Sequence, residues 1–179
     1  GLPAHVLFVH FVVVLVPLTA ALVAFSVAWP AARRRIGAAA PGCALVTLIL
    51  VVVTANAGEW LKARTPPDPL VRVHAELGDQ LVYWSASVLV VSVVWWLMHA
   101  DRVPGVPGRF TARIRAGSAH RMVNVAVAVA VMILAVGSCI EVYRIGDSGA
   151  TAVWHDQLTG ETGGRCLLYT SDAADDSLR

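Results

Sequence analysis

Three histidines are the residues of this sequence whose type and position could do chemistry in an apolar setting. His5 and His10 lie five residues apart in the opening string "HVLFVHF", and His74 begins "HAELGD". A neutral imidazole can bind a metal or a haem iron through one ring nitrogen while the other donates a hydrogen bond. Residues five apart on an α-helix point about 140° away from each other, so His5 and His10 are expected to do different jobs. We expect His5 to lie at the water interface and His10, about 10 Å deeper than Pro3, to be buried.

The first hypothesis for these residues is a b-type haem or metal site with His10 and His74 as axial ligands. Two imidazoles from facing helices of a bundle are a workable ligand pair for haem iron. Glu59 and Asp79 would then orient the two histidines through their second ring nitrogens. The alternative is a hydrogen-bonded network that holds helix ends together, a structural or partner-binding role in which the same histidines meet these acids and Glu141. The sequence leaves both hypotheses open.

The elements that must position these side chains are membrane-spanning helices. Hydrophobic residues make up 57% of the 179 residues and charged residues only 15%, a composition outside the range of soluble domains. Four apolar runs are each long enough to cross about 30 Å of hydrocarbon as an α-helix. They cover residues 6–29, 43–60, 80–98 and 122–143. Continuous runs without a two-residue alternation favour helices over a barrel, so the sequence predicts an all-α protein with four transmembrane helices in one up-down bundle.

Arginine residues set the predicted orientation of this bundle. Three of them, at 33–35, fill the first connection, whereas the second connection and the C-terminal part mix basic and acidic residues. The third connection carries Arg102, Arg109, Arg113, Arg115 and Arg121. Basic residues in short loops stay on the cytoplasmic side, so both termini are expected outside the cytoplasm, in a bacterial cytoplasmic (inner) membrane. Topology and anionic lipid headgroups account for the arginines, and no nucleic-acid partner is expected.

Small and weakly polar residues mark the predicted inner faces of the helices. One stripe, with members seven residues apart, runs through the third apolar run. It consists of Gly78, Ser85, Ser92 and His99, with Leu81 and Val88 beside it. The second run offers Thr47, Thr54 and Gly58, and the fourth offers Ala128, Ala135 and Ser138 or Cys139. Close backbone approach and interhelical hydrogen bonds hold membrane bundles together, so we expect these residues to face neighbouring helices.

Four strings in order along the chain carry a resemblance to a known family. They are "HVLFVHF", "GEW" at 58–60, "HAELGD" at 74–79 and "VYRIGDSGATAVW" at 142–154. Over nearly all of residues 1–155 the chain resembles domain-of-unknown-function family 2231, a group of bacterial four-helix membrane proteins. That family typically opens with H-P-x-x-V-H-F, and Val6 stands here where the family usually has proline. The domain sometimes adjoins a Rieske-type iron–sulfur domain, so the resemblance implies a redox setting with a Rieske-type or cytochrome partner.

Other readings of the chain are weaker. A solute or ion transporter usually carries ionisable residues or broken helices near the membrane midplane, where this chain has only proline, serine and threonine. No catalytic constellation is recognised, and "GDSGA" at 146–150 is a chance match to a protease loop whose glycines are expected to end the last helix. Residues 1–165 are expected to form one membrane domain with a processed or truncated start. The string from Cys166 to Asp176 resembles a translated sequencing adapter, so 166–179 are predicted not to be native.

Overall fold

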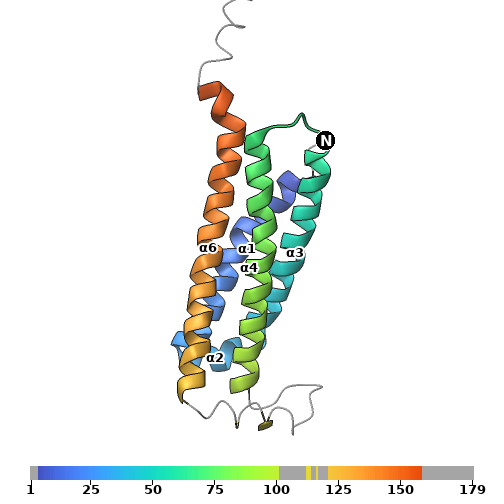
Figure 1. Cartoon of the computed structure of the whole chain (residues 1–179). Coiled ribbons are helices and arrows are strands. Elements are labelled where there is room, and N and C mark those ends of the chain that lie inside the picture. Colours follow the sequence, from blue (N-terminus) through green and yellow to red (C-terminus); the bar gives the residue numbers. More distant parts are fainter. Residues whose placement is uncertain (1–3, 101–111, 114–115, 117–120, 159–179) are drawn as a thin grey trace, which may run out of the picture.

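The computed structural model describes residues 4–100, 112–113, 116 and 121–158, and these residues are helical with short connections. The helices are α1 (Ala4–Ala28), α2 (Pro30–Ile36), α3 (Ala39–Lys62), α4 (Pro69–His99) and α6 (Arg121–Leu158), shown in Figure 1. The predicted all-α class is confirmed for this part of the chain. Arg102, Arg109 and Arg115 of the predicted third connection, and the predicted adapter at 166–179, lie outside the described residues.

Four of these helices, α1, α3, α4 and α6, are long and apolar enough to cross a membrane, which indicates a multi-pass membrane protein. Each overlaps one of the four predicted spans. Their outward faces carry large apolar side chains such as Phe11 and Phe25 of α1 and Ile133 of α6, all more than half exposed. Apolar side chains on the outside of a bundle are suited to contact with lipid.

The α4 helix begins eleven residues before the predicted span, at Pro69. Its start is well defined, because the Asp68 side chain accepts a hydrogen bond from the Leu70 amide at 2.7 Å and proline occupies the first helical position. The added turns carry Arg72, Glu76 and Asp79, charges that interrupt the apolar run. A helix can carry such charges where it leaves the hydrocarbon. A prediction from apolarity alone therefore starts α4 too late in the sequence.

The α6 helix continues to Leu158, fifteen residues beyond the predicted span. The prediction that Gly146 and Gly149 end this helix is wrong, because both lie inside it. A glycine costs a helix only about 1 kcal/mol relative to alanine, which packing against a neighbouring helix can offset. With 31 and 38 residues, α4 and α6 are about 46 Å and 57 Å long, more than the thickness of the hydrocarbon.

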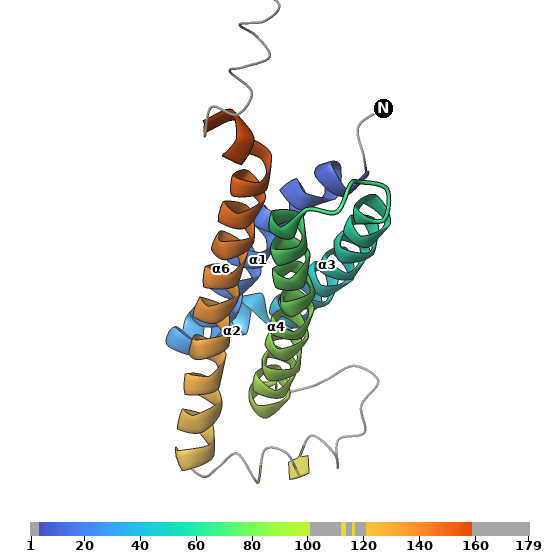
Figure 2. The same ribbon diagram turned by 45° about the horizontal axis from the view of Figure 1, so that its top comes forward.

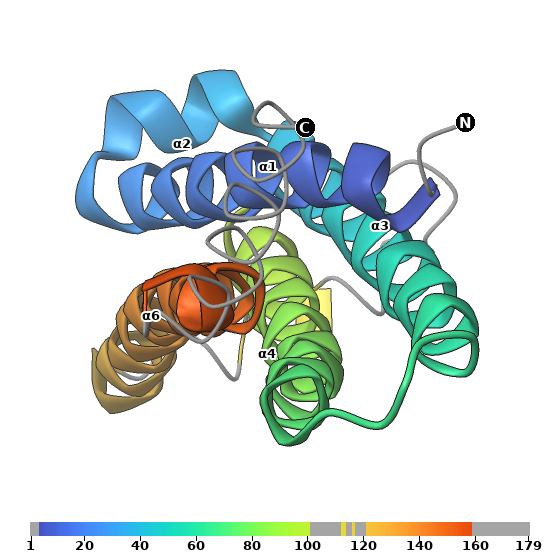
Figure 3. The same cartoon turned by 90° about the horizontal axis from the view of Figure 1, so that it is seen from above.

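The four long helices form a ring in the order α1, α3, α4, α6. The α1 helix contacts α3 and α6, and α4 contacts the same two helices. Figure 3 shows this ring from above, and Figure 2 shows α4 and α6 side by side over much of their length. The short α2 helix packs along α1 at the opposite end of the bundle from the start of α1. Consecutive long helices are therefore neighbours, and α6 closes the ring onto α1.

The bundle interior holds two apolar clusters with a polar layer between them. The first cluster consists of Val12, Val16, Val51, Leu81 and Val142. The second, nearer to α2, consists of Val23, Ala40, Ala44, Val88, Trp95 and Val131. Four hydroxyl residues lie between the clusters along their helices, one from each long helix: Thr19, Thr47, Ser85 and Ser138. The predicted inward position of the hydroxyl residues is confirmed, since Thr47, Thr54, Ser85, Ser92 and Ser138 are all buried.

Candidate functional site

A pocket of about 460 Å³ lies at the end of the bundle away from α2. All four long helices line it, and most of the lining side chains are apolar, among them Val9, Leu81 and Ile145. Its polar residues are His5, Glu59, Lys62, Thr65, His74 and Asp79. The volume lies in the range of small-molecule and cofactor sites, which are typically apolar with a few polar groups.

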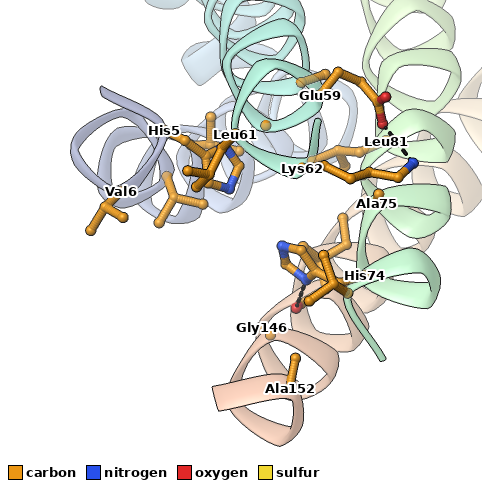
Figure 4. Close-up of a pocket in the computed structure, with 18 of the residues that line it drawn as sticks. His5, Val6, Glu59, Leu61, Lys62, His74, Ala75, Leu81, Gly146 and Ala152 are labelled. Carbon is orange, nitrogen blue, oxygen red and sulfur yellow. Dashed lines mark hydrogen bonds and ion pairs between the residues drawn. The ribbon is translucent and has the colours of Figure 1, made fainter. Parts of the chain in front are cut away.

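Two of the polar residues, His5 of α1 and His74 of α4, face each other across this pocket (Figure 4). Their ring centres are 6.3 Å apart and the ring planes are nearly perpendicular, at 87°. Both side chains are half-buried. The structure therefore brings together two imidazoles from two different helices.

Each of these rings is fixed by a hydrogen bond to a neighbouring helix. Nδ1 of His5 lies 3.0 Å from the Thr54 carbonyl oxygen of α3, and Nδ1 of His74 lies 3.1 Å from the Ile145 carbonyl oxygen of α6. The Ser148 hydroxyl lies 3.1 Å from the same His74 nitrogen. A carbonyl oxygen can only accept, so Nδ1 carries the proton in both rings. In the neutral rings Nε2 then keeps a free lone pair, the arrangement found in histidines that ligate metals.

Glycines provide the space that the two rings occupy. A Cβ atom at Gly58 would lie 3.1 Å from Cε1 of His5, and one at Gly149 would lie 3.0 Å from Cε1 of His74. In both cases the glycine follows the hydrogen-bonded carbonyl by four residues, Thr54 before Gly58 and Ile145 before Gly149. Each histidine is thus held by a carbonyl and a glycine one turn apart on the adjacent helix.

The acids predicted to orient the histidines are placed differently. Glu59 lines the pocket but forms an ion pair with Lys62 at 3.0 Å on its own helix, and Asp79 lines the pocket with an exposed side chain. Glu141 is only 3% exposed and binds Arg144 at 3.1 Å. Backbone carbonyls, rather than these carboxylates, bind the Nδ1 atoms of His5 and His74.

His10 lies away from the pocket. Its side chain is exposed, and Nδ1 lies 2.7 Å from the Val6 carbonyl oxygen of its own helix. The expectation that His10 is buried and His5 remains at the interface is therefore reversed. The pair that the structure brings together is His5 and His74, not the predicted pair of His10 and His74. The cause is the rotation of α1, whose apolar residues surround the helix and give no single inward side.

Another signal in the sequence identifies the inward side of α1. Starting from His5, every seventh residue is Val12, Thr19 and Ser26. Val12, Thr19 and Ser26 are each at most 5% exposed. This stripe has the same spacing as the one recognised in α4, and it places His5, not His10, on the inner face.

The two imidazoles are not joined by a third metal ligand at the pocket, as far as the described residues show. Within the ranges 4–100, 112–113, 116 and 121–158, no group of three His, Cys, Asp or Glu side chains is placed to hold a metal ion. Metal ions bound by protein alone usually need three or four protein ligands.

No protein-family model, curated protein or solved structure matched the chain. The resemblance to domain-of-unknown-function family 2231 stays a prediction.

Proposed function

We propose that this protein binds a b-type haem between His5 and His74 and transfers electrons at a membrane. The observation that supports this proposal is the separation of the two rings. A metal that binds two imidazoles would lie about 2 Å from one nitrogen of each, so the two rings would have to lie close together. The observed separation is 6.3 Å.

The residues around the pocket fit such a group. A haem iron needs only axial ligands from the protein, because the macrocycle supplies the others. The apolar lining suits a flat apolar ring, and Gly78 and Gly146 leave open space, since a Cβ at either would meet nothing within 4 Å. Lys62 and Glu59 also line the pocket, where they form an ion pair at 3.0 Å.

The chain's own residues have distinct tasks in this proposal. A bound haem supplies one-electron redox chemistry. His5 and His74 would hold the iron, and the carbonyls of Thr54 and Ile145 fix the tautomer and orientation of the rings through Nδ1. The surrounding valine and leucine side chains limit the access of water, which tunes a redox potential.

We further propose an up-down bundle in a bacterial inner membrane, with both termini and the pocket on the outer side. The support comes from Arg33, Arg34 and Arg35, which all lie on α2, at the opposite end from the pocket. Arginines of this kind are retained in the cytoplasm. A pocket on the outer side would exchange electrons with an extracytoplasmic redox protein, for which a Rieske-type or cytochrome partner is the proposal that follows from the family resemblance.

Reduced-minus-oxidised spectra of the full chain in membranes from haem-supplied cells test this function. We expect a b-type band that is lost in His5→Ala and in His74→Ala. His10→Ala is the matched control on the same helix and should keep the band, because His10 faces away from the pocket. A wild-type protein without the band contradicts haem binding, and a band lost only in His10→Ala contradicts the ligand assignment.

A structural role is the second candidate, and the same hydrogen bonds favour it. His5 links α1 to α3, and His74 links α4 to α6. The substitution His74→Asn separates the two functions, because the asparagine amide can still donate to the Ile145 carbonyl but provides no imidazole Nε2. If the role is structural alone, His74→Asn keeps the thermal stability of the wild type, and the wild type itself shows no b-type band. If haem is bound, His74→Asn loses the band although the apoprotein remains folded.

A further inference from the structure

A second, much smaller cavity lies in the polar layer at the centre of the bundle. Its polar lining is Thr19 of α1, Thr47 of α3, Ser85 of α4 and Ser138 of α6, which we call the hydroxyl layer. Each of the four is between 2% and 5% exposed. Val16, Ala44 and Val88 complete the lining, and the cavity volume is about 10 Å³. One hydroxyl from every long helix thus converges on a small internal space.

The hydrogen bonds of the hydroxyl layer leave one member unsatisfied. The Thr19 and Thr47 hydroxyl oxygens lie 2.7 Å apart, and the Ser138 hydroxyl donates to the Ala135 carbonyl at 2.9 Å. Within the described part of the chain, the buried Ser85 Oγ has no hydrogen-bond partner. Buried polar groups in native proteins are nearly always paired, and an unpaired one is costly.

Other serines of α4 show that this lack of a partner is specific to the cavity. The Ser87 hydroxyl donates to the Tyr83 carbonyl at 2.8 Å, and the Ser92 hydroxyl donates to the Leu89 carbonyl at 2.8 Å. Both use a carbonyl of their own helix, which is the usual solution for serine in an apolar helix. Ser85 does not, although the helix offers it the same solution. Its hydroxyl is left available to the cavity.

We propose that the hydroxyl layer binds one water molecule, independently of whether haem binds in the larger pocket. The cavity volume is at the lower limit of about 10–15 Å³ that a water needs, and a buried water typically makes about three hydrogen bonds. The water accepts the proton of Ser85 and donates to the free lone pairs of Ser138 and of the threonine pair. None of the lining residues is charged, which favours a neutral ligand over an ion.

The bound water connects the helices of the bundle at one point. Without it, the side-chain bonds of the hydroxyl layer between helices join α1 to α3 alone among the described residues, from the Thr19 hydroxyl to the Thr47 hydroxyl at 2.7 Å and to the Cys43 sulfur at 3.2 Å. With it, α4 and α6 join the same hydrogen-bonded group. The two apolar clusters lie on either side, so the water is separated from the histidine pocket by Val12, Val16 and Leu81 and their neighbours.

A high-resolution structure of the full chain in lipid or detergent tests the proposal directly. We expect a density peak about 2.5–3.0 Å from Ser85 Oγ, within hydrogen-bonding distance of Ser138 Oγ and of one threonine hydroxyl. Absence of that peak, at a resolution where other internal waters are visible, overturns the proposal.

Thermal unfolding of two matched variants provides a second test, because the difference between their Tm values has opposite signs for a hydrated and a dry cavity. Ser85→Ala removes an anchor of the water, so we expect its Tm to be lower than that of the control Ser87→Ala, which removes a hydroxyl of the same helix outside the cavity. The control also corrects for the higher helix propensity of alanine. If the cavity is dry, Ser85→Ala removes an unpaired hydroxyl and its Tm rises above the control. That outcome contradicts the proposal.

Discussion

The two pocket histidines depend on the absence of a side chain at Gly58 and Gly149. The rings of His5 and His74 lie so close to these glycines that a Cβ atom would stand 3.1 Å and 3.0 Å, respectively, from Cε1, a tight contact. Gly58 and Gly149 carry no functional group, but their lack of a side chain allows each ring to lie where it does. This makes the glycines as informative as the histidines for testing the site.

We predict that Gly58→Ala and Gly149→Ala each weaken haem binding. The new methyl group forces the ring to move by a few tenths of an ångström. Overpacking of this kind costs about 1–3 kcal/mol, which corresponds to a loss of affinity of roughly 5- to 150-fold. Titration of the apoprotein with haem, followed by absorbance, measures the effect. Gly42→Ala is the control on α3, because a Cβ there meets nothing within 4 Å. Equal affinity in all three variants would show that the ring positions do not matter.

At this scale the sequence predicts part of the site. The sequence identifies His74 as a candidate, because it precedes an apolar run and begins a polar string, and the structure places it in the pocket. Depth along the helix, taken alone, favours His10 over His5 as the buried histidine. The depth of a residue depends on the rise along the helix, whereas the direction of its side chain depends on the rotation of the helix about its axis. In α1, the seven-residue spacing that relates His5, Thr19 and Ser26 is the pattern that indicates this rotation. The carbonyls of Thr54 and Ile145 leave no trace in residue type, so no sequence pattern could reveal them.

Among the elements, the contact between α4 and α6 positions His74 over its glycine. Near the middle of this contact the Trp84 ring packs directly on Gly137, where a Cβ atom would overlap the ring carbons. Farther along, the bond from His74 to Ile145 joins the same two helices. The two helices thus approach closely because one residue has no side chain.

We predict that Gly137→Ala destabilises the protein. The Trp84 ring has to move or the helices have to separate, at a cost of about 1–3 kcal/mol. Thermal unfolding in detergent, followed by circular dichroism, provides the measurement. Gly146→Ala lies on the same helix with open space around the new methyl group, so its stability should be unchanged or higher by up to about 1 kcal/mol. A Tm for Gly137→Ala no lower than that of Gly146→Ala would contradict this account of the contact.

The existence of the four long helices is predictable, and their ends are less so. Long runs without ionisable residues identify the part that crosses the hydrocarbon, because lipid excludes charge. The additional turns of α4 and α6 carry charged residues, namely Arg72, Glu76 and Asp147. A prediction from apolarity assigns such turns to the connections between helices. Those turns are stabilised by helix–helix contacts, such as the one between His74 and Ser148, that no local pattern shows.

For the whole molecule, the proposed orientation can be tested with cysteine labelling. Thr65 is exposed in the connection between α3 and α4, and Ala38 is exposed beside the arginines of α2. In a background without native cysteines, a membrane-impermeant maleimide should label Thr65→Cys in spheroplasts. It should label Ala38→Cys only after permeabilisation, because the arginine-rich end is expected in the cytoplasm. The reverse pattern would place the histidine pocket on the cytoplasmic side.

The pairing of each histidine with its carbonyl and glycine also bears on how the molecule assembles. One half of the site lies on α1 and α3, and the other half lies on α4 and α6. Each half is complete once its own two helices have packed, but the rings come within 6.3 Å only when the two helix pairs dock. A ligand that bridges the rings would bind the docked state alone and stabilise it by mass action. Occupancy of the pocket would then stabilise the final step of assembly, in which the α1–α3 pair docks on the α4–α6 pair. The amount of bound ligand would measure this docking rather than the formation of any single helix.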